Sequence, residues 1–137
     1  MHSGRESCEQ EARDRIKDLI ILQKKLSASF GDDNYNVFVF GSYPTIRYDK
    51  TKSDVDVAVY TPDLDLYKRI AIEIETFFNE KNIKVDLFYI DISIPAPIYL
   101  APLHAQIEFT DYYPYELKNF KNKCNEELLK IKEKMAV

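Results

Sequence analysis

The sequence predicts an α/β domain, of the α+β kind, with a small mixed β-sheet of about four strands covered by helices mainly on one side. Apolar residues recur at helical spacing near both ends of the chain, and short β-branched runs alternate with another helical pattern between them. No internal repeat or Gly/Ser-rich linker interrupts this order. With 137 residues, 45% of them hydrophobic, the chain predicts one domain spanning residues 1–137.

The first half of the chain predicts a helix, two strands and a second helix. The first helix covers about residues 9–29 and ends at the turn sequence GDDNYN. NVFVF and DVDVAVY then read as buried strands, and they open a core region of about residues 36–92. Thr61 is expected to cap the second helix, with Pro62 as its first residue and an end near Asn82. Its inward side is expected to carry Leu66, Ile70, Ile74, Phe77 and Phe78.

The second half predicts two further strands and a terminal helix. IKVDLFYI is expected to be the third strand, and the proline-rich SIPAPIYLAPLHA a loop with a short helix. QIEFT is expected to form a fourth, edge strand. A charged helix follows over about residues 114–135. Its apolar stripe consists of Leu117, Phe120, Cys124, Leu128, Ile131 and Met135.

Composition argues against several classes of protein. The net charge of −4 disfavours nucleic acid as a partner, although a local basic patch would still permit it. Cys8 and Cys124 lie far apart without metal-ligand spacing, which is typical of a reduced setting. No apolar run approaches the roughly 20 residues of a membrane span, and the N-terminus is polar. We therefore expect a cytoplasmic protein that does not enter a membrane.

Three aspartates occupy positions where apolar residues would be expected. Asp54 and Asp56 flank Val55 in the second strand, and Asp86 lies between Val85 and Leu87 in the third. Residues two apart on a strand share a face, so the first two carboxylates are expected side by side. Aspartate is a poor strand former, and close carboxylates repel each other. If the two strands are neighbours, the three carboxylates would hold two Mg²⁺ ions for phosphoryl or nucleotidyl displacement. The alternative is that these aspartates lie on a strand face exposed to solvent and bind no metal.

The connection before Asp54 carries candidates for binding phosphate. Gly41 ends the first strand, where a glycine permits close approach of a ligand, and Ser42 offers a hydroxyl and a backbone amide. Arg47 lies in the same connection and is a candidate for neutralising triphosphate charge. Lys50 and Lys52 lie in the same connection, and a solvated loop would explain them equally well.

Together these residues resemble a known family. The order of these motifs is similar to that of the nucleotidyltransferase superfamily typified by DNA polymerase beta. In that order an apolar strand is followed by Gly-Ser, about ten further residues, Asp-x-Asp in a strand and a lone Asp in a later strand. Here the pattern reads VFGSYPTIRYDKTKSDVDVAVY and then KVDLFYI. The small size resembles the minimal nucleotidyltransferases of prokaryotes, which are often encoded beside a helical HEPN partner as toxin–antitoxin pairs.

The resemblance implies a role for each motif position. Asp54 and Asp56 match the metal-binding pair, and Asp86 matches the third carboxylate, which helps hold the catalytic metal and accepts the proton of the attacking hydroxyl. Gly41 and Ser42 match the turn that binds the β- and γ-phosphates. The implied reaction is transfer of AMP from ATP to a hydroxyl of a macromolecule, with a HEPN-type toxin as the first candidate acceptor and an antitoxin role for this chain.

The sequence also departs from the family pattern and leaves alternatives open. Minimal members often carry a GSRARG-like run, whereas this chain reads GSYPTIRY, with Tyr43 at the first Arg place. An inactive nucleotidyltransferase-fold binding module is one alternative. Transfer to an RNA 3′ end or to a small molecule is another. The oligomeric state and the nucleotide base stay open.

Overall fold

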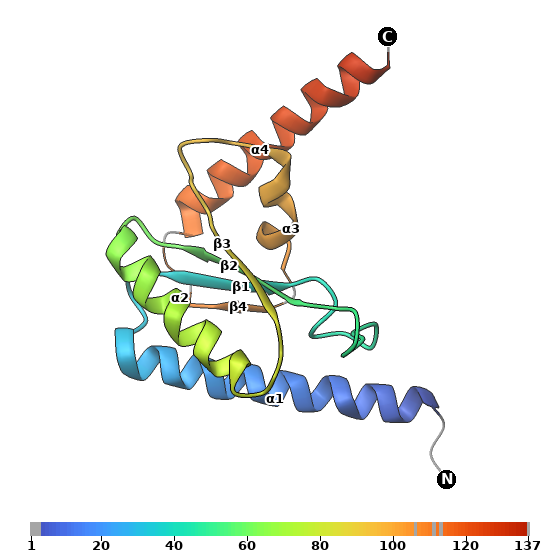
Figure 1. Ribbon diagram of the computed structural model, residues 1–137. Helices are drawn as coiled ribbons and strands as arrows, with labels where there is room; N and C mark the ends of the chain where they lie inside the picture. Colours follow the sequence, from blue (N-terminus) through green and yellow to red (C-terminus); the bar gives the residue numbers. More distant parts are fainter. Residues whose placement is uncertain (1–3, 106, 111, 113, 137) are drawn as a thin grey trace.

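The computed structural model describes residues 4–105, 107–110, 112 and 114–136. The elements in chain order are α1 (Gly4–Phe30), β1 (Asn36–Phe40), β2 (Val55–Tyr60), α2 (Leu64–Asn79), β3 (Val85–Tyr89), the 3₁₀ turn η1 (Pro97–Tyr99), α3 (Leu100–Leu103), β4 (Ile107–Phe109) and α4 (Pro114–Met135). Figure 1 shows them as a sheet between two helical layers. No helix of the described residues is long and apolar enough to cross a membrane.

The four strands form one mixed sheet in the order β3-β2-β1-β4. β1 pairs antiparallel with β2 and with β4, whereas β2 and β3 run parallel. The parallel pair follows from α2, because a parallel partner needs a crossover connection that returns the chain to the same end of the sheet. This arrangement confirms the predicted fold class, with β4 at one edge as expected. Gln106, which the sequence placed in β4, lies outside the described residues.

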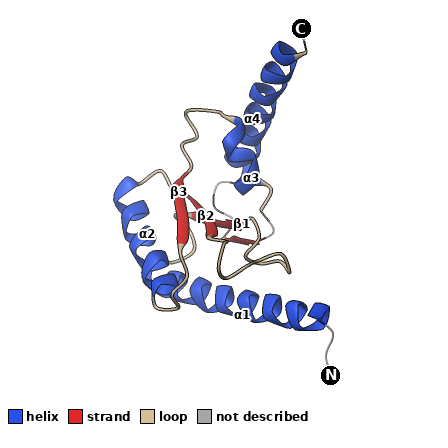
Figure 2. Ribbon diagram, turned by 45° about the vertical axis from the view of Figure 1, so that its right-hand side comes forward, coloured by secondary structure: helices blue, strands red, loops and turns tan. Residues whose placement is uncertain are grey.

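The two faces of the sheet are covered unequally. The valines of β1 and β2 pack with α1 and α2 in the larger hydrophobic cluster. Alternate residues of the same strands, such as Phe38 and Ala58, face a smaller cluster beneath α3 and the first half of α4. Figure 2 shows these two layers from a second direction. The second half of α4 runs past the sheet, and Ile131 and Met135 are exposed there.

The helices differ in detail from the sequence expectations. α1 begins at Gly4 instead of about residue 9, because its Glu-, Gln- and Arg-rich start favours helix. Helical spacing places Ile16 on the same apolar stripe of α1 as Ala12 and Leu19, but Ile16 is 37% exposed and the neighbouring Arg15 is buried instead.

The start of α2 also corrects the sequence expectation. Asp63, and not Thr61, caps the helix, because its carboxylate accepts the amides of Asp65 and Leu66 at 3.0 and 3.2 Å. The first helical residue is therefore Leu64 instead of Pro62, and the helix ends at Asn79. The five residues that the sequence placed on its inner side are its buried residues.

Candidate active site

The structure brings the three aspartates to one corner of the sheet. Asp56 and Asp86 are register partners on the parallel strands β2 and β3, so their Cα atoms lie about 5 Å apart. Asp54 directly precedes β2 and lies two residues before Asp56. Strand alternation turns the Asp56 and Asp86 side chains away from the face on which Val55 and Val57 join the larger hydrophobic cluster. The carboxylates therefore occupy the face covered by α3 and α4, at the end of the sheet where β2 begins.

The charges of this corner are poorly compensated. Burial, followed by the carboxylates of Asp86 and Asp54, raises the pKa of Asp56. The Lys84 ammonium lies 4.0 Å from Asp54 Oδ2, but this lysine side chain is 83% exposed and is therefore largely screened by water. Two adjacent strands thus hold a set of oxygen ligands whose mutual repulsion a cation would relieve.

Gly41 allows the end of β1 to approach this corner closely. Phe40, the last residue of β1, is the register partner of Asp56, and the chain turns at Gly41 with a φ of +75°. A Cβ atom added at Gly41 would lie 3.2 Å from Asp56 Cγ and would overlap Asp56 Oδ2. Any side chain at this position would therefore displace a carboxylate of the corner. Gly41 is needed both for its backbone conformation and for the room that Asp56 occupies.

Ser42 begins a hydrogen-bonded turn next to the carboxylates. Its carbonyl accepts the Thr45 amide at 2.9 Å and the Thr45 hydroxyl at 2.7 Å, which closes the Ser42–Thr45 turn. The turn places Ser42 immediately after Gly41. Arg47 follows the turn, and its side chain is exposed and makes no ion pair with any described residue. The structure therefore gathers five of the six candidate residues, and it shows no ion pair between the Arg47 side chain and the three carboxylates.

The donor set of this corner fits a divalent cation, although no ready-made cage is present. Among the described residues no group of three His, Cys, Asp or Glu side chains is drawn together tightly enough to hold a metal ion. Three carboxylates of poorly compensated charge, with Asp56 and Asp86 in register, nevertheless supply the hard oxygen ligands that Mg²⁺ prefers. The chemistry of these ligands therefore agrees with a divalent cation at this corner.

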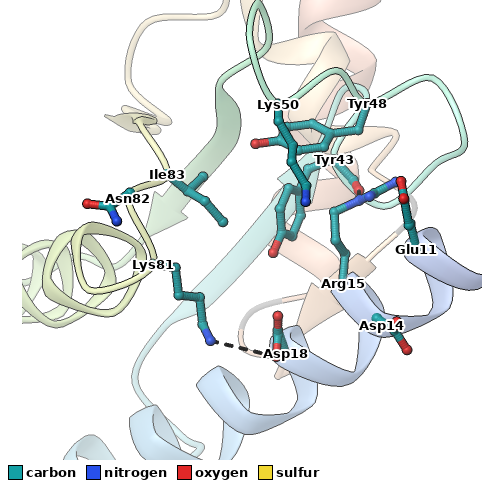
Figure 3. Close-up of a pocket in the computed structure, with 10 residues that line it drawn as sticks. All are labelled: Glu11, Asp14, Arg15, Asp18, Tyr43, Tyr48, Lys50, Lys81, Asn82 and Ile83. Atoms are coloured by element: carbon teal, nitrogen blue, oxygen red, sulfur yellow. Dashed lines mark hydrogen bonds and ion pairs between the residues drawn. The ribbon is translucent and has the colours of Figure 1, made fainter. Parts of the chain in front are cut away.

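A cavity of about 370 Å³ lies beside the turn, on the opposite face of the sheet from the carboxylates. Figure 3 shows α1 on one side of it, with Lys81 and Asp18 at one end and Tyr48 and Lys50 at the other. Lys81 and Asp18 form an ion pair at 3.7 Å. The Tyr43 hydroxyl is buried and has no hydrogen-bond partner among the described residues. The cavity mixes acidic and basic side chains, so its charge alone selects no ligand.

Arg15 is the residue of this region that the sequence analysis missed. Its Nε donates to the Tyr43 carbonyl and its terminal nitrogen to the Thr45 carbonyl, both at 2.7 Å. The guanidinium also lies 4.8 Å from the centre of the Tyr48 ring. The one available signal was an arginine beside the apolar stripe of the first helix. Its partners are backbone carbonyls 28 and 30 residues away, which no sequence pattern reveals.

The fold and the carboxylate corner define a class of small α/β protein that presents acidic side chains on adjacent strands behind a Gly-Ser turn. This arrangement suits chemistry on phosphates that a divalent metal assists. The comparison with protein families agrees. The chain matches the model of the nucleotidyltransferase domain over residues 19–124, and it belongs to that family. No curated protein and no solved structure matches the chain. The matched segment contains all six candidate site residues, and family membership assigns the chain to nucleotide transfer in general terms.

Proposed function

We propose that this protein is a Mg²⁺-dependent nucleotidyltransferase that moves AMP from ATP to a hydroxyl of a macromolecular acceptor. The observation that carries the proposal is the register of Asp56 beside Asp86, with Asp54 two residues before, in a domain of the nucleotidyltransferase family. Carboxylates that lie side by side at a partly buried corner of a sheet lower the stability of the fold, because they repel each other and lose hydration. Cation binding for phosphate chemistry gives this arrangement a use.

The side chains divide the work by position. Asp54, Asp56 and Asp86 would hold the metal ions, of which two are expected. When bound, the ions offset the charge that develops on the phosphates. Asp86 is the most exposed of the three and can receive the proton of the attacking hydroxyl. Gly41 and Ser42 would receive the β- and γ-phosphates, and Arg47 is free to swing toward the triphosphate because no described partner holds it.

The acceptor is proposed to bring its own recognition surface. The elements of the described residues account for the sheet and its two covering layers, and none of them adds a separate domain for an acceptor. A partner protein is therefore the first candidate, in particular a HEPN-type toxin that this chain would neutralise as an antitoxin. The net charge of −4 disfavours an RNA 3′ end.

A second candidate function is a binding module of the same fold without turnover. The observation in its favour is the run GSYPTIRY, in which Arg47 is the only cation and stands apart from the carboxylates. Such a module would bind a nucleotide or a partner at the same corner and release no pyrophosphate.

Transfer of label from each of the four NTPs tests the proposal. The protein is incubated with Mg²⁺, with and without the product of the neighbouring gene, and label is followed on protein and on RNA together with pyrophosphate release. Label from ATP on the partner protein is expected, with loss of at least about a hundredfold in Asp54→Asn, Asp56→Asn and Asp86→Asn. Asp33→Asn, which removes an exposed carboxylate from the turn after α1, is the matched control and should behave as wild type.

The remaining outcomes separate the two candidates. Nucleotide binding without pyrophosphate release, on any acceptor, would refute transfer and favour the binding module. Label on RNA instead of protein would overturn the choice of acceptor and leave the reaction class in place.

A further inference from the structure

Arg15 connects the first helix to the turn that follows the Gly-Ser pair. It is 8% exposed, and its guanidinium donates to the Tyr43 and Thr45 carbonyls at 2.7 Å each. A planar guanidinium suits this task, since its donors leave in fixed directions and contact two acceptors at once. The rings of Tyr43 and Tyr48 lie 5.8 and 4.8 Å from the guanidinium carbon and cover it from water.

These two bonds hold the turn against α1 and fix the direction of the peptide unit that follows Thr45. A trans peptide unit is planar, so its carbonyl and its amide point in opposite directions. When the Thr45 carbonyl is directed at Arg15 on α1, the amide of Ile46 in the same peptide unit is directed away from α1. α1 lies on the face of the sheet opposite to the carboxylates. Arg15 therefore turns a backbone donor away from the helical layer, next to the Ser42–Thr45 turn.

The contact is specific to an arginine at this one position of α1. Lysine would carry the same charge on a point-like ammonium and could not match two carbonyls with the same fixed geometry. Arg13, two residues earlier on the same helix, is exposed and provides a comparison of equal charge. Arg15 also precedes the segment that matches the family model, which begins at residue 19. The contact between Arg15 and the turn therefore depends on a part of α1 that lies outside the matched segment.

We propose that Arg15 is a positioning residue that holds the Ser42–Thr45 turn in the orientation needed to receive the triphosphate of the nucleotide. This inference rests on the proposed function. Arg15 does not touch the nucleotide in this scheme, because it lies on α1, on the face of the sheet opposite to the carboxylates. Its loss should therefore weaken nucleotide binding through the turn while the carboxylates, which are held by β2 and β3, keep their arrangement.

The test compares Arg15→Ala and Arg15→Lys with Arg13→Ala. We expect Arg15→Ala to raise the KM for MgATP about tenfold or more with a smaller change in kcat, Arg15→Lys to lie between it and wild type, and Arg13→Ala to match wild type. A merely structural role would lower the amount of active enzyme and leave KM unchanged. If Arg15→Ala does not fold, Arg15→Lys carries the comparison, since it keeps the charge and most of the volume.

A second readout needs no nucleotide. Trypsin cleavage after Arg47, followed by mass spectrometry on the folded protein, reports the mobility of the turn itself, and it should be several times faster in Arg15→Ala than in Arg13→Ala. Equal cleavage rates in the two variants, or an unchanged KM, would overturn the inference. If wild type transfers no nucleotide but cleavage accelerates in Arg15→Ala, the proposed function is wrong while the hold of Arg15 on the turn is right.

Discussion

Gly41→Ala gives a test of the carboxylate corner with a control inside the same chain. Gly31 and Gly41 adopt almost the same backbone conformation, with φ of +76° and +75°. A Cβ at Gly31 meets no atom within 4 Å, whereas a Cβ at Gly41 would overlap Asp56 Oδ2 and lie 3.2 Å from Asp56 Cγ. Both substitutions therefore carry the energetic cost of an alanine at positive φ. Only Gly41→Ala adds a steric collision with a candidate metal ligand.

The expected magnitudes follow from that difference. An alanine in the left-handed region costs about 1–2 kcal/mol, so Gly31→Ala should lose about this much free energy of unfolding, and Gly41→Ala should lose at least this much because of the added collision. The Asp56 carboxylate must move by about 1 Å to clear the new methyl group, and a displacement of this size in a reacting site costs about a hundredfold in rate. Gly41→Ala should therefore lose at least about a hundredfold of its transfer activity, and Gly31→Ala should lose little.

Two measurements check this reasoning. Urea unfolding gives the free energy of unfolding of both variants, and transfer of labelled AMP together with Mn²⁺ binding reports the corner. If Gly41→Ala remains as active as Gly31→Ala and binds Mn²⁺ equally well, then Asp56 does not act where the structure places it, and its role as a metal ligand fails.

Three further predictions concern stability. Because burial and two neighbouring carboxylates raise the pKa of Asp56, its ionisation opposes folding. Asp56→Asn should therefore be more stable than wild type at pH 7, and the difference should disappear as the pH falls below the ordinary aspartate pKa of about 3.9, because the wild-type carboxyl is then protonated in both the folded and the unfolded state. Urea unfolding across that pH range decides this, and a constant difference would contradict it. Tyr43→Phe removes a buried hydroxyl without a described partner and should raise the free energy of unfolding by about 1 kcal/mol, whereas a loss of stability would mean that the hydroxyl is bonded. Asp63→Ala should lose about 1 kcal/mol and Asp63→Ser much less, as thermal unfolding would show, since serine restores the cap of α2; equal losses would argue against the cap.

Local sequence patterns were sufficient to predict most of the helices and strands. The buried side of α2 follows from helical spacing, and α4 spans Pro114–Met135, as its stripe and its starting proline predict. Element ends were less accurate. Thr61 and Asp63 are both good capping residues, and the competition between them is settled by which side chain reaches the first free amides of the helix.

The identities of the candidate site residues were readable from the sequence, but their assembly was not. Asp56 and Asp86 stand out because each interrupts an apolar strand, which is a local anomaly, and Asp54 stands out because it lies two residues before Asp56. Whether Asp86 lies beside Asp56 depends on strand order, and strand order depends on how α2, which connects β2 to β3, packs on the sheet. The parallel register of Asp56 with Asp86 is therefore a result of tertiary structure.

By itself, then, the sequence determined the fold class, the elements and the acidic residues in them, because hydrophobic periodicity and strand propensity act over a few residues. Only the tertiary structure decided what these residues contact. It placed two carboxylates in register, left Gly41 with no room for a side chain, and directed Arg15 of α1 to two carbonyls of a distant turn. Such contacts join residues far apart in the chain, and packing of the whole domain is the physical cause that brings them together.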